Sequence, residues 1–91
     1  MNIAYIDGVP ELLTADCANK NVHRIGGPAV ILADGSKIWY INGERHRTDG
    51  PAYEGADGHY EWYLHGEHYS FNEFLKKLPM EQAVLVALEW K

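Results

Sequence analysis

The stretch HRIGGPA at His23–Ala29 returns 23 positions later as HRTDGPA at His46–Ala52. Other matches keep the same offset of 23: Asp34-Gly35 with Asp57-Gly58, Trp39-Tyr40 with Trp62-Tyr63, and Gly43-Glu44 with Gly66-Glu67. Chance would not hold so many matches in one register without a gap. The chain therefore contains two tandem copies of a 23-residue unit in residues 22–69, and units of this length are typically supersecondary structures that stack on one another.

A degenerate half-unit precedes the two copies. Tyr5–Gly8 matches Tyr40–Gly43, and the following residues depart from the pattern. Residues 1–21 are thus interpreted as a half-repeat followed by an inserted segment. The insertion near Thr14–Asn21 is predicted to be a loop, or a short helix capped by Thr14 or Asp16.

Each full unit is predicted to form β-hairpins. In the first unit, Pro28–Ala33 is an apolar strand and Ser36–Ile41 is the return strand, with Asp34-Gly35 as a type I′ turn between them. Asn42-Gly43 is predicted to be a second turn of this type. Successive hairpins build an antiparallel meander, here of about six to eight strands by the count of turns.

The last part of the chain changes character to helical. Ser70–Glu73 has the spacing of a capping box. Phe71, Phe74, Leu75 and Leu78 follow at helical intervals, and Pro79 ends this helix and opens the next. A second helix is predicted over Met80–Trp90, with a final strand as the alternative. The fold class is therefore α+β in a single domain of residues 1–91, with the helical segment 70–91 packed on one face of the meander.

Side-chain alternation along the return strands assigns two faces to the sheet. Trp39, Ile41, Trp62 and Leu64 share the face that the helices are expected to cover. The helical residues expected on that face are Phe71, Phe74, Leu75, Val84 and Leu88.

The opposite face is predicted to carry a row of Tyr5, Tyr40 and Tyr63. Exposed tyrosines are favoured at protein interfaces, and cross-strand packing is the structural alternative. Glu54 and Glu61 are added as candidate partner-binding residues because the first unit has isoleucine at their positions.

Composition and charge restrict the function. The net charge is −5, which makes nucleic acid an unlikely partner, since nucleic-acid coats need clustered positive charge. Cys17 is the only cysteine, so the chain cannot form an internal disulfide, and this fits a reducing cytoplasm. A secretory signal and an apolar run long enough to span a membrane are both lacking, so no membrane partner is expected.

The two His-Arg pairs are the clearest candidates for chemistry. His23, Arg24, His46 and Arg47 occupy equivalent places in adjacent units, and their Arg side chains could hold a phosphate or carboxylate. The alternative is that each His and Arg satisfies carbonyls and acids of the next turn, such as Asp49 or Asp57. Repetition favours this alternative, because a residue required in every unit usually serves the geometry of the unit.

No metal, cofactor or catalytic signature emerges from the remaining residues. His59, His65 and His68 lack the cysteine partners of a structural zinc site. Cys17 lies in the least patterned segment, without the base and orienting group that a nucleophile needs. The chain is therefore predicted not to be an enzyme and to need no cofactor.

The motif HRxxGPA, with its Asp-Gly, Trp-Tyr and Asn-Gly-Glu, resembles a group of MORN-like tandem repeats found in small proteins of tailed phages and bacteria. The resemblance covers about Val22–Ser70 and implies stacked β-hairpins and roles in binding, without a shared chemistry. It implies a phage-encoded protein, for which interference with a host enzyme or defence component would be a reasonable role by analogy.

The sequence thus predicts a non-catalytic interaction protein that acts in the cytoplasm by binding, and so inhibiting, a host protein. A small-ligand protein that sequesters an anionic nucleotide at Arg24 and Arg47 is the first alternative, and a structural phage accessory protein is the second. A homodimer through the C-terminal helix is also expected to be possible, because the middle of this helix is apolar nearly all round.

Overall fold

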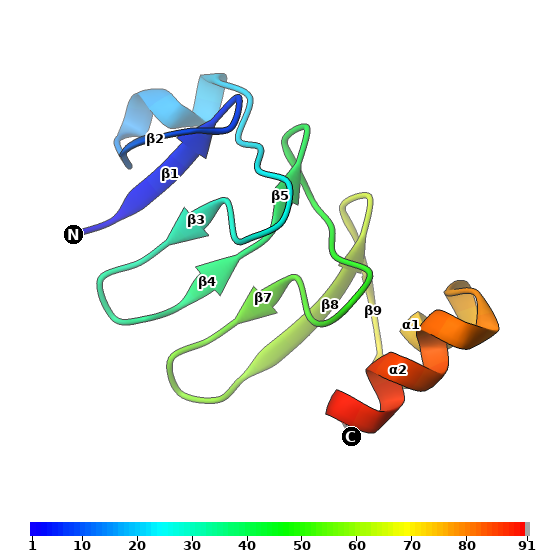
Figure 1. Ribbon diagram of the computed structural model, residues 1–91. Coiled ribbons are helices and arrows are strands. Elements are labelled where there is room, and N and C mark those ends of the chain that lie inside the picture. The colour runs from blue at the N-terminus through cyan, green and yellow to red at the C-terminus, as the bar shows by residue number, and fades with distance from the viewer. Residues whose placement is uncertain (91) are drawn as a thin grey trace.

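A computed structural model describes residues 1–90 and contains β-strands followed by two helices (Figure 1). In chain order the elements are β1 (Ile3–Ile6), β2 (Val9–Leu12), the 3-10 helix η1 (Ala15–Asn19), β3 (Val30–Ile31), β4 (Lys37–Ile38), β5 (Tyr40–Ile41), β6 (Glu44–Arg45), β7 (Tyr53–Glu54), β8 (Tyr60–Leu64), β9 (Glu67–Tyr69), α1 (Phe71–Lys77) and α2 (Met80–Trp90).

Seven strands form one antiparallel sheet in the order β2-β1-β3-β4-β7-β8-β9, while β5 and β6 pair separately. The hairpins follow one another across the molecule, and the helices lie beside β8 and β9 at the end of the stack (Figure 1). The predicted α+β class, with an antiparallel meander and C-terminal helices packed against it, is confirmed.

The two kinds of predicted turn have different outcomes. Asn42 and Gly43 have φ angles of 49° and 81°, as a type I′ turn requires, and Asp7-Gly8 and His65-Gly66 repeat this conformation. The same prediction for Asp34-Gly35 is wrong, because Gly35 alone of the pair has a positive φ. Its amide N–H donates to the Leu32 carbonyl at 3.0 Å, which gives a three-residue loop with the glycine in the left-handed position.

The predicted continuous strand Ser36–Ile41 is interrupted at Trp39. The Trp39 N–H donates to the Ala52 carbonyl at 2.7 Å, whereas its own carbonyl accepts from the His46 N–H at 3.1 Å. The backbone of Trp39 is therefore hydrogen-bonded to two different segments of the chain. At this residue the chain passes from the main sheet into the β5–β6 hairpin. This break divides the return strand of the first unit between two hairpins, whereas β8 of the second unit runs without a break from its pairing with β7 to its pairing with β9.

The helices close the C-terminal end of the stack. The capping box is present: the Ser70 hydroxyl accepts from the Glu73 N–H at 3.2 Å, and the Glu73 carboxylate accepts from the Ser70 N–H at 3.1 Å. Buried Phe74 and Val86 pack on Trp62. The partly buried side chains around this core belong to Leu64, Tyr69, Phe71, Leu75, Leu78 and Trp90.

The expectation that Val84 and Leu88 cover the sheet is wrong. Both side chains are exposed, and Val86 takes the inward position instead. The helices also cover only the Trp62 end of the face, so Trp39 and Ile41 are left beside an open groove. An evenly apolar helix has no polar stripe to set its rotation, which explains why the sequence pattern misassigned its inward face.

A second core lies at the N-terminal end, on the other face of the sheet. Ala4, Cys17 and Val30 are buried together there. The inserted segment forms η1, which brings Cys17 onto this face. Thr14 stands at the N-cap position of η1, but its side chain forms no capping hydrogen bond, so the predicted capping role is wrong.

Candidate functional site

The motif histidines hold the turns of the following hairpin. His23 Nδ1 accepts the Asn42 N–H at 3.0 Å, and His46 Nδ1 accepts the His65 N–H at 3.0 Å. Each bond satisfies a backbone donor at the first residue of a type I′ turn. These two ring nitrogens therefore serve the fold, although their partners are backbone N–H groups and not the carbonyls and acids that the structural alternative named.

The motif arginines join each unit to an aromatic ring that precedes it in the chain. The Arg24 guanidinium lies 4.1 Å from the centre of the Tyr5 ring and donates to the Pro28 carbonyl at 3.2 Å. The Arg47 guanidinium lies 3.9 Å from the centre of the Trp39 ring and donates to the Pro51 carbonyl at 3.1 Å. We call these two stacked pairs the arginine ladder.

The glycine of each Gly-Pro-Ala segment makes room for the ladder. A Cβ built on Gly27 would lie 3.0 Å from Arg24 Cζ, and one on Gly50 would lie 2.7 Å from Arg47 Cζ. Each guanidinium is thus held between an aromatic ring and a bare backbone. Most of the repeated motif is explained by this arrangement, because the arginine, the glycine and the proline carbonyl all belong to it.

The two arginines differ in their acidic partners. Arg47 forms ion pairs with Asp49 at 2.7 Å and Glu54 at 2.5 Å, and its side chain is only 14% exposed. Among residues 1–90, no carboxylate forms an ion pair with Arg24. Of the predicted anion strip, Arg24 is therefore the residue whose charge is left for an external group.

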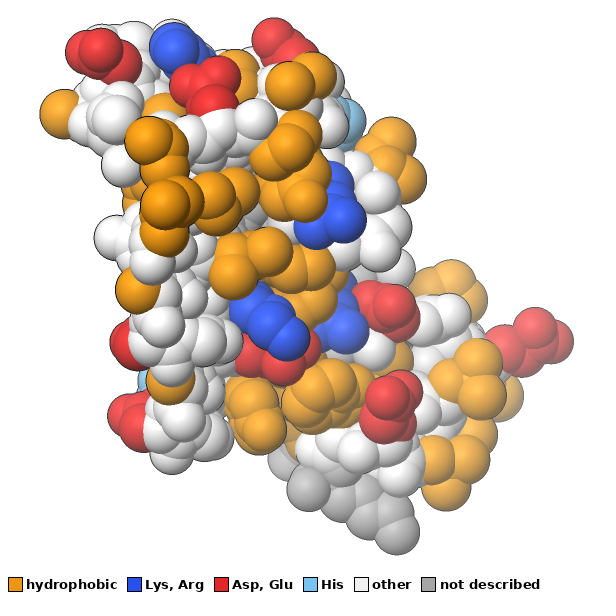
Figure 2. Space-filling view, turned by 60° about the vertical axis from the view of Figure 1, so that its left-hand side comes forward, with side chains coloured by type: hydrophobic (Ala, Val, Ile, Leu, Met, Phe, Trp, Pro, Cys, Tyr) orange, Lys and Arg blue, Asp and Glu red, His pale blue; other side chains and the backbone are white. Residues whose placement is uncertain are grey.

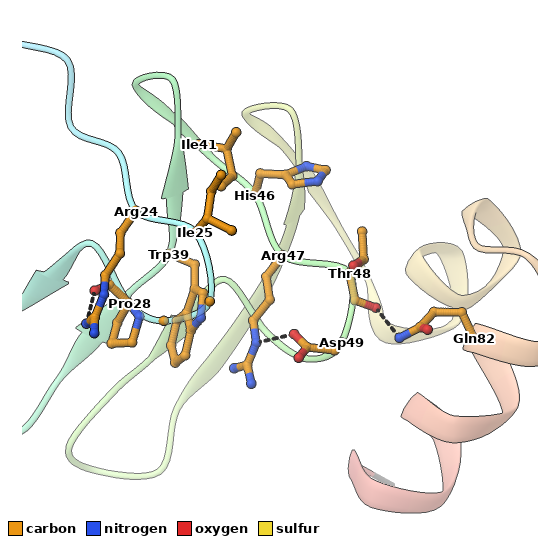
Figure 3. A pocket seen from close by; sticks show the side chains of 12 residues that line it. Arg24, Ile25, Pro28, Trp39, Ile41, His46, Arg47, Thr48, Asp49 and Gln82 are labelled. Carbon is orange, nitrogen blue, oxygen red and sulfur yellow. Dashed lines mark hydrogen bonds and ion pairs between the residues drawn. The ribbon is translucent and has the colours of Figure 1, made fainter. Parts of the chain in front are cut away.

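Arg24 borders a groove of about 490 Å³ that lies over Trp39, between the loop at residues 24–28 and the loop at residues 46–49 (Figure 3). Ile25 stands at its border and is 81% exposed. In the space-filling view, basic side chains lie among hydrophobic ones along the sheet (Figure 2). The groove is lined by Arg24, Ile25, Gly26, Gly27, Pro28, Trp39, Ile41, His46, Arg47, Thr48, Asp49 and Gln82.

Helix α2 borders the groove at its far end (Figure 3). The Gln82 side-chain amide donates to the Thr48 carbonyl at 3.1 Å, and Trp90 Nε1 donates to the Asp49 carbonyl at 3.3 Å. The helix therefore anchors the loop of the second unit through two of its carbonyls, while both loops line the groove.

The predicted row of three tyrosines is not formed, because Tyr5 faces away from Tyr40 and Tyr63. Ala4 and Ile6, the neighbours of Tyr5 in β1, pack in the same cluster as Tyr40. Alternation then places Tyr5 on the opposite face. The cause is the break at Trp39: the Tyr5 N–H donates to the Ala29 carbonyl at 2.7 Å, as that of Trp39 does to Ala52, so Tyr5 is the structural counterpart of Trp39.

Tyr40 and Tyr63 are brought together by Arg45, which donates to their hydroxyl groups at 3.3 and 3.2 Å. The Tyr63 hydroxyl donates to Glu61 at 3.1 Å, and Glu61 also contacts His59. The hydrogen bond from His59 lowers the pKa of the Glu61 carboxyl. Glu61 thus joins these tyrosines, whereas Glu54 lies on the other face with Arg47. This internal network agrees with the packing alternative.

Cys17 lies in a second, mostly apolar pocket of about 430 Å³ on the N-terminal core. Its Sγ contacts Thr14, Glu11 and the Leu12 carbonyl, and none of these contacts within the described chain comes from a histidine. Over residues 1–90, no group of three metal-ligating side chains is found. Nor does a helix in that range have the length and apolar character needed to cross a bilayer.

Comparisons of the chain with protein-family models, with curated proteins and with solved structures find no match. Sequence reasoning found Arg24 and Arg47 but missed that Trp39, Ile25 and Gln82 share their groove. A signal for this was present, because the two loops differ most there: Ile25-Gly26 stands against Thr48-Asp49.

Stability is expected to fall as the pH is lowered through the titration range of His46. Burial, with a smaller effect of His65, lowers the pKa of His46 from its ordinary value of 6.5. The unfolded chain then takes up this proton at a higher pH than the folded chain, so stability is lost as the pH falls below about 6.5. Protonation also removes the Nδ1 acceptor that holds the His65 turn.

The measurement is the melting temperature between pH 7.5 and 5.0, compared with that of His46→Asn. Asparagine can offer an oxygen to the same N–H without titrating. The variant should show a shallower pH dependence. Equal slopes in the two proteins would contradict the assignment.

Proposed function

We propose that this chain is a non-catalytic binding protein. It binds part of a protein partner in the groove over Trp39. The observation that carries the proposal is the contrast between the two units. The second unit covers its Trp62 with the protein's own helices, whereas the first unit leaves Trp39, Ile25 and Ile41 along a groove of about 490 Å³. An open groove lined by Trp39, Ile25 and Ile41, with an arginine at its border that has no ion pair within residues 1–90, has the composition of an interaction site.

The charge of the groove favours an acidic partner surface. Arg24 is held by its stacking on Tyr5 and its bond to Pro28, so its guanidinium is already ordered before a partner arrives. An ordered guanidinium without an acid partner can accept a carboxylate in a two-pronged geometry with little loss of side-chain entropy. The resemblance to phage repeat proteins leads us to propose that the partner is a host protein and that binding inhibits it.

The same arginine supports a second candidate, a protein that binds a small anionic ligand such as a nucleotide. This candidate is weaker, because Asp49 and Glu54 already neutralise Arg47, which leaves one guanidinium for a phosphate group instead of two. Both candidate functions use Arg24. They differ in the ligand, which is a protein surface in the first and a small anion in the second.

Replacement of Arg24 by glutamine is expected to weaken partner binding about tenfold or more, because a charge-assisted hydrogen bond worth about 1.5–3 kcal/mol is lost. The measurement is photo-crosslinking in lysate of the proposed bacterial host, with p-benzoylphenylalanine in place of Ile25. Arg24→Gln should remove the crosslinked product, and the charge-matched Lys20→Gln should keep it.

The same photo-reactive residue in place of Ala33, which is exposed on the tip of the β3–β4 hairpin, serves as a positional control. A product that forms equally from both positions would contradict a specific groove. Native mass spectrometry with ATP tests the second candidate. A mass shift that Arg24→Gln abolishes, without any protein crosslink, would replace the first candidate with the second.

A further inference from the structure

Trp90 shows what kind of side chain fits against a ladder arginine. Its ring centre lies 5.6 Å from the Arg47 guanidinium carbon, 5.3 Å from the Tyr60 ring and 6.1 Å from the Trp62 ring. Its Nε1 would be 3.0 Å from a Cβ on Gly50. We call this place, formed by Arg47, Gly50, Tyr60 and Trp62, the Trp90 seat.

The first unit carries a second copy of this seat. The residues 23 positions earlier are Arg24, Gly27, Lys37 and Trp39, and three of them line the open groove. The three atoms nearest to a Cβ built on Gly27 all belong to Arg24, at 3.0 to 3.2 Å, whereas the indole Nε1 of Trp90 is among the three nearest to a Cβ on Gly50. We call this place the open seat.

The two seats have opposite charge. In the Trp90 seat, Asp49 and Glu54 accompany Arg47. Their counterparts beside the open seat are Gly26 and Ile31, and the counterpart of Tyr60 is Lys37. The open seat therefore has an arginine and a lysine and no acid at either corresponding position, while the Trp90 seat combines one cation with two acids. Lys37 stands opposite Glu54 in the β4–β7 pairing, so Arg24 is the main positive charge that the open seat presents to the groove.

We propose, on the basis of the binding function above, that the partner inserts an aromatic side chain flanked by carboxylates into the open seat. The ring would lie against Trp39 and Arg24 as Trp90 lies against Trp62 and Arg47. An indole N–H would donate to the Gly26 carbonyl, the counterpart of the Asp49 carbonyl that Trp90 uses. The flanking carboxylates would supply to Arg24 and Lys37 the negative charge that Asp49 and Glu54 supply within the second unit.

The test uses the full chain and the blocked pentapeptide Asp-Glu-Trp-Glu-Asp, followed by nuclear magnetic resonance of the Trp39 indole N–H and the Arg24 Nε–H. We expect saturable shifts at both groups that weaken as salt is raised. Asp-Glu-Ala-Glu-Asp tests the ring, and Lys-Lys-Trp-Lys-Lys tests the charge. Each should bind at least tenfold more weakly than the acidic tryptophan peptide.

Two variants of the chain sharpen the test. Arg24→Gln should weaken binding of the acidic peptide at least tenfold. Ile31→Glu keeps Arg24 but gives the first unit the acid that Glu54 gives the second, so it should weaken binding to a similar extent. Its melting temperature and the Trp62 resonance show whether the fold is kept, and Lys20→Gln should bind as the unchanged chain does.

The possible failures are distinguishable. If the basic peptide bound as well as the acidic one, or if Ile31→Glu folded and bound normally, the acidic–aromatic inference would be overturned. If the peptide failed to bind while a protein still crosslinked at Ile25, the inference would fall and the binding function would stand. If neither bound, both would fall.

Discussion

Replacement of Phe74 by alanine is expected to lower the free energy of unfolding by about 3–5 kcal/mol, a large part of the stability of a small domain. Phe74 is completely buried and its ring centre lies 5.1 Å from that of Trp62. Truncation would leave a cavity between α1 and β8 and remove one of the side chains that cover Trp62. Because α1 connects β9 to α2, loosening it would also loosen α2.

Thermal and urea unfolding, followed by circular dichroism, measure this effect. A loss of this size should lower the melting temperature by roughly 12 °C or more for a chain of this length. Val84→Ala is the control, because Val84 lies on α2, is 52% exposed and belongs to neither core cluster. Its effect should stay within about 0.5 kcal/mol. Similar losses for the two variants would show that the helices do not pack as described.

Gly50→Ala is expected to cost about 2–4 kcal/mol, which is large for the addition of one methyl group. The added Cβ would lie 2.7 Å from Arg47 Cζ and 3.0 Å from Trp90 Nε1. Arg47 cannot move aside easily, since Trp39, Asp49 and Glu54 hold its guanidinium. Trp90 would therefore leave its seat, and its contacts with Arg47, Tyr60 and the Asp49 carbonyl would be lost.

Gly27→Ala is the internal control for this prediction. The atoms nearest to its Cβ all belong to Arg24, at 3.0 Å or more. Tyr5 and Pro28 hold Arg24, but it has no ion pair among the described residues and so yields more easily than Arg47, and the cost should be about 1 kcal/mol or less. In a Trp90→Ala background, Gly50→Ala should cost clearly less than in the unchanged chain, because the clash with the indole is gone. Equal costs at Gly27 and Gly50 would contradict the role given to the ion pairs and Trp90.

The repeat predicted much of the fold because its turns are encoded locally. Asn42-Gly43 adopts the left-handed conformation that its two residues favour, and Ser70 and Glu73 form their capping box within four consecutive residues. The face of the sheet on which Tyr5 lies was predicted wrongly, because that prediction depended on contacts distant in the sequence. The interruption at Trp39 arises from hydrogen bonds to Ala52 and His46, which no local pattern of residues records.

The candidate site was predictable in part. The sequence identified both arginines, but it did not reveal that glycine and an aromatic ring hold them within the fold. The difference between Arg24 and Arg47 depends on residues that were visible as differences between the units, namely Asp49 against Gly26 and Glu54 against Ile31. A comparison of the two units at the positions where only the second has an acidic residue, and not only at the positions where the residues are identical, would have singled out Arg24.

The arrangement of the three tryptophans has a practical consequence for spectroscopy. Trp39 lines the groove, Trp62 lies in the helical core, and Trp90 links that core to the ladder through Arg47. The opposite face, with Tyr40, Arg45 and Tyr63, has no indole. Tryptophan fluorescence therefore reports on one side of this protein. The fluorescence of Trp39 reports on the groove, and that of Trp62 and Trp90 reports on whether the helices are docked.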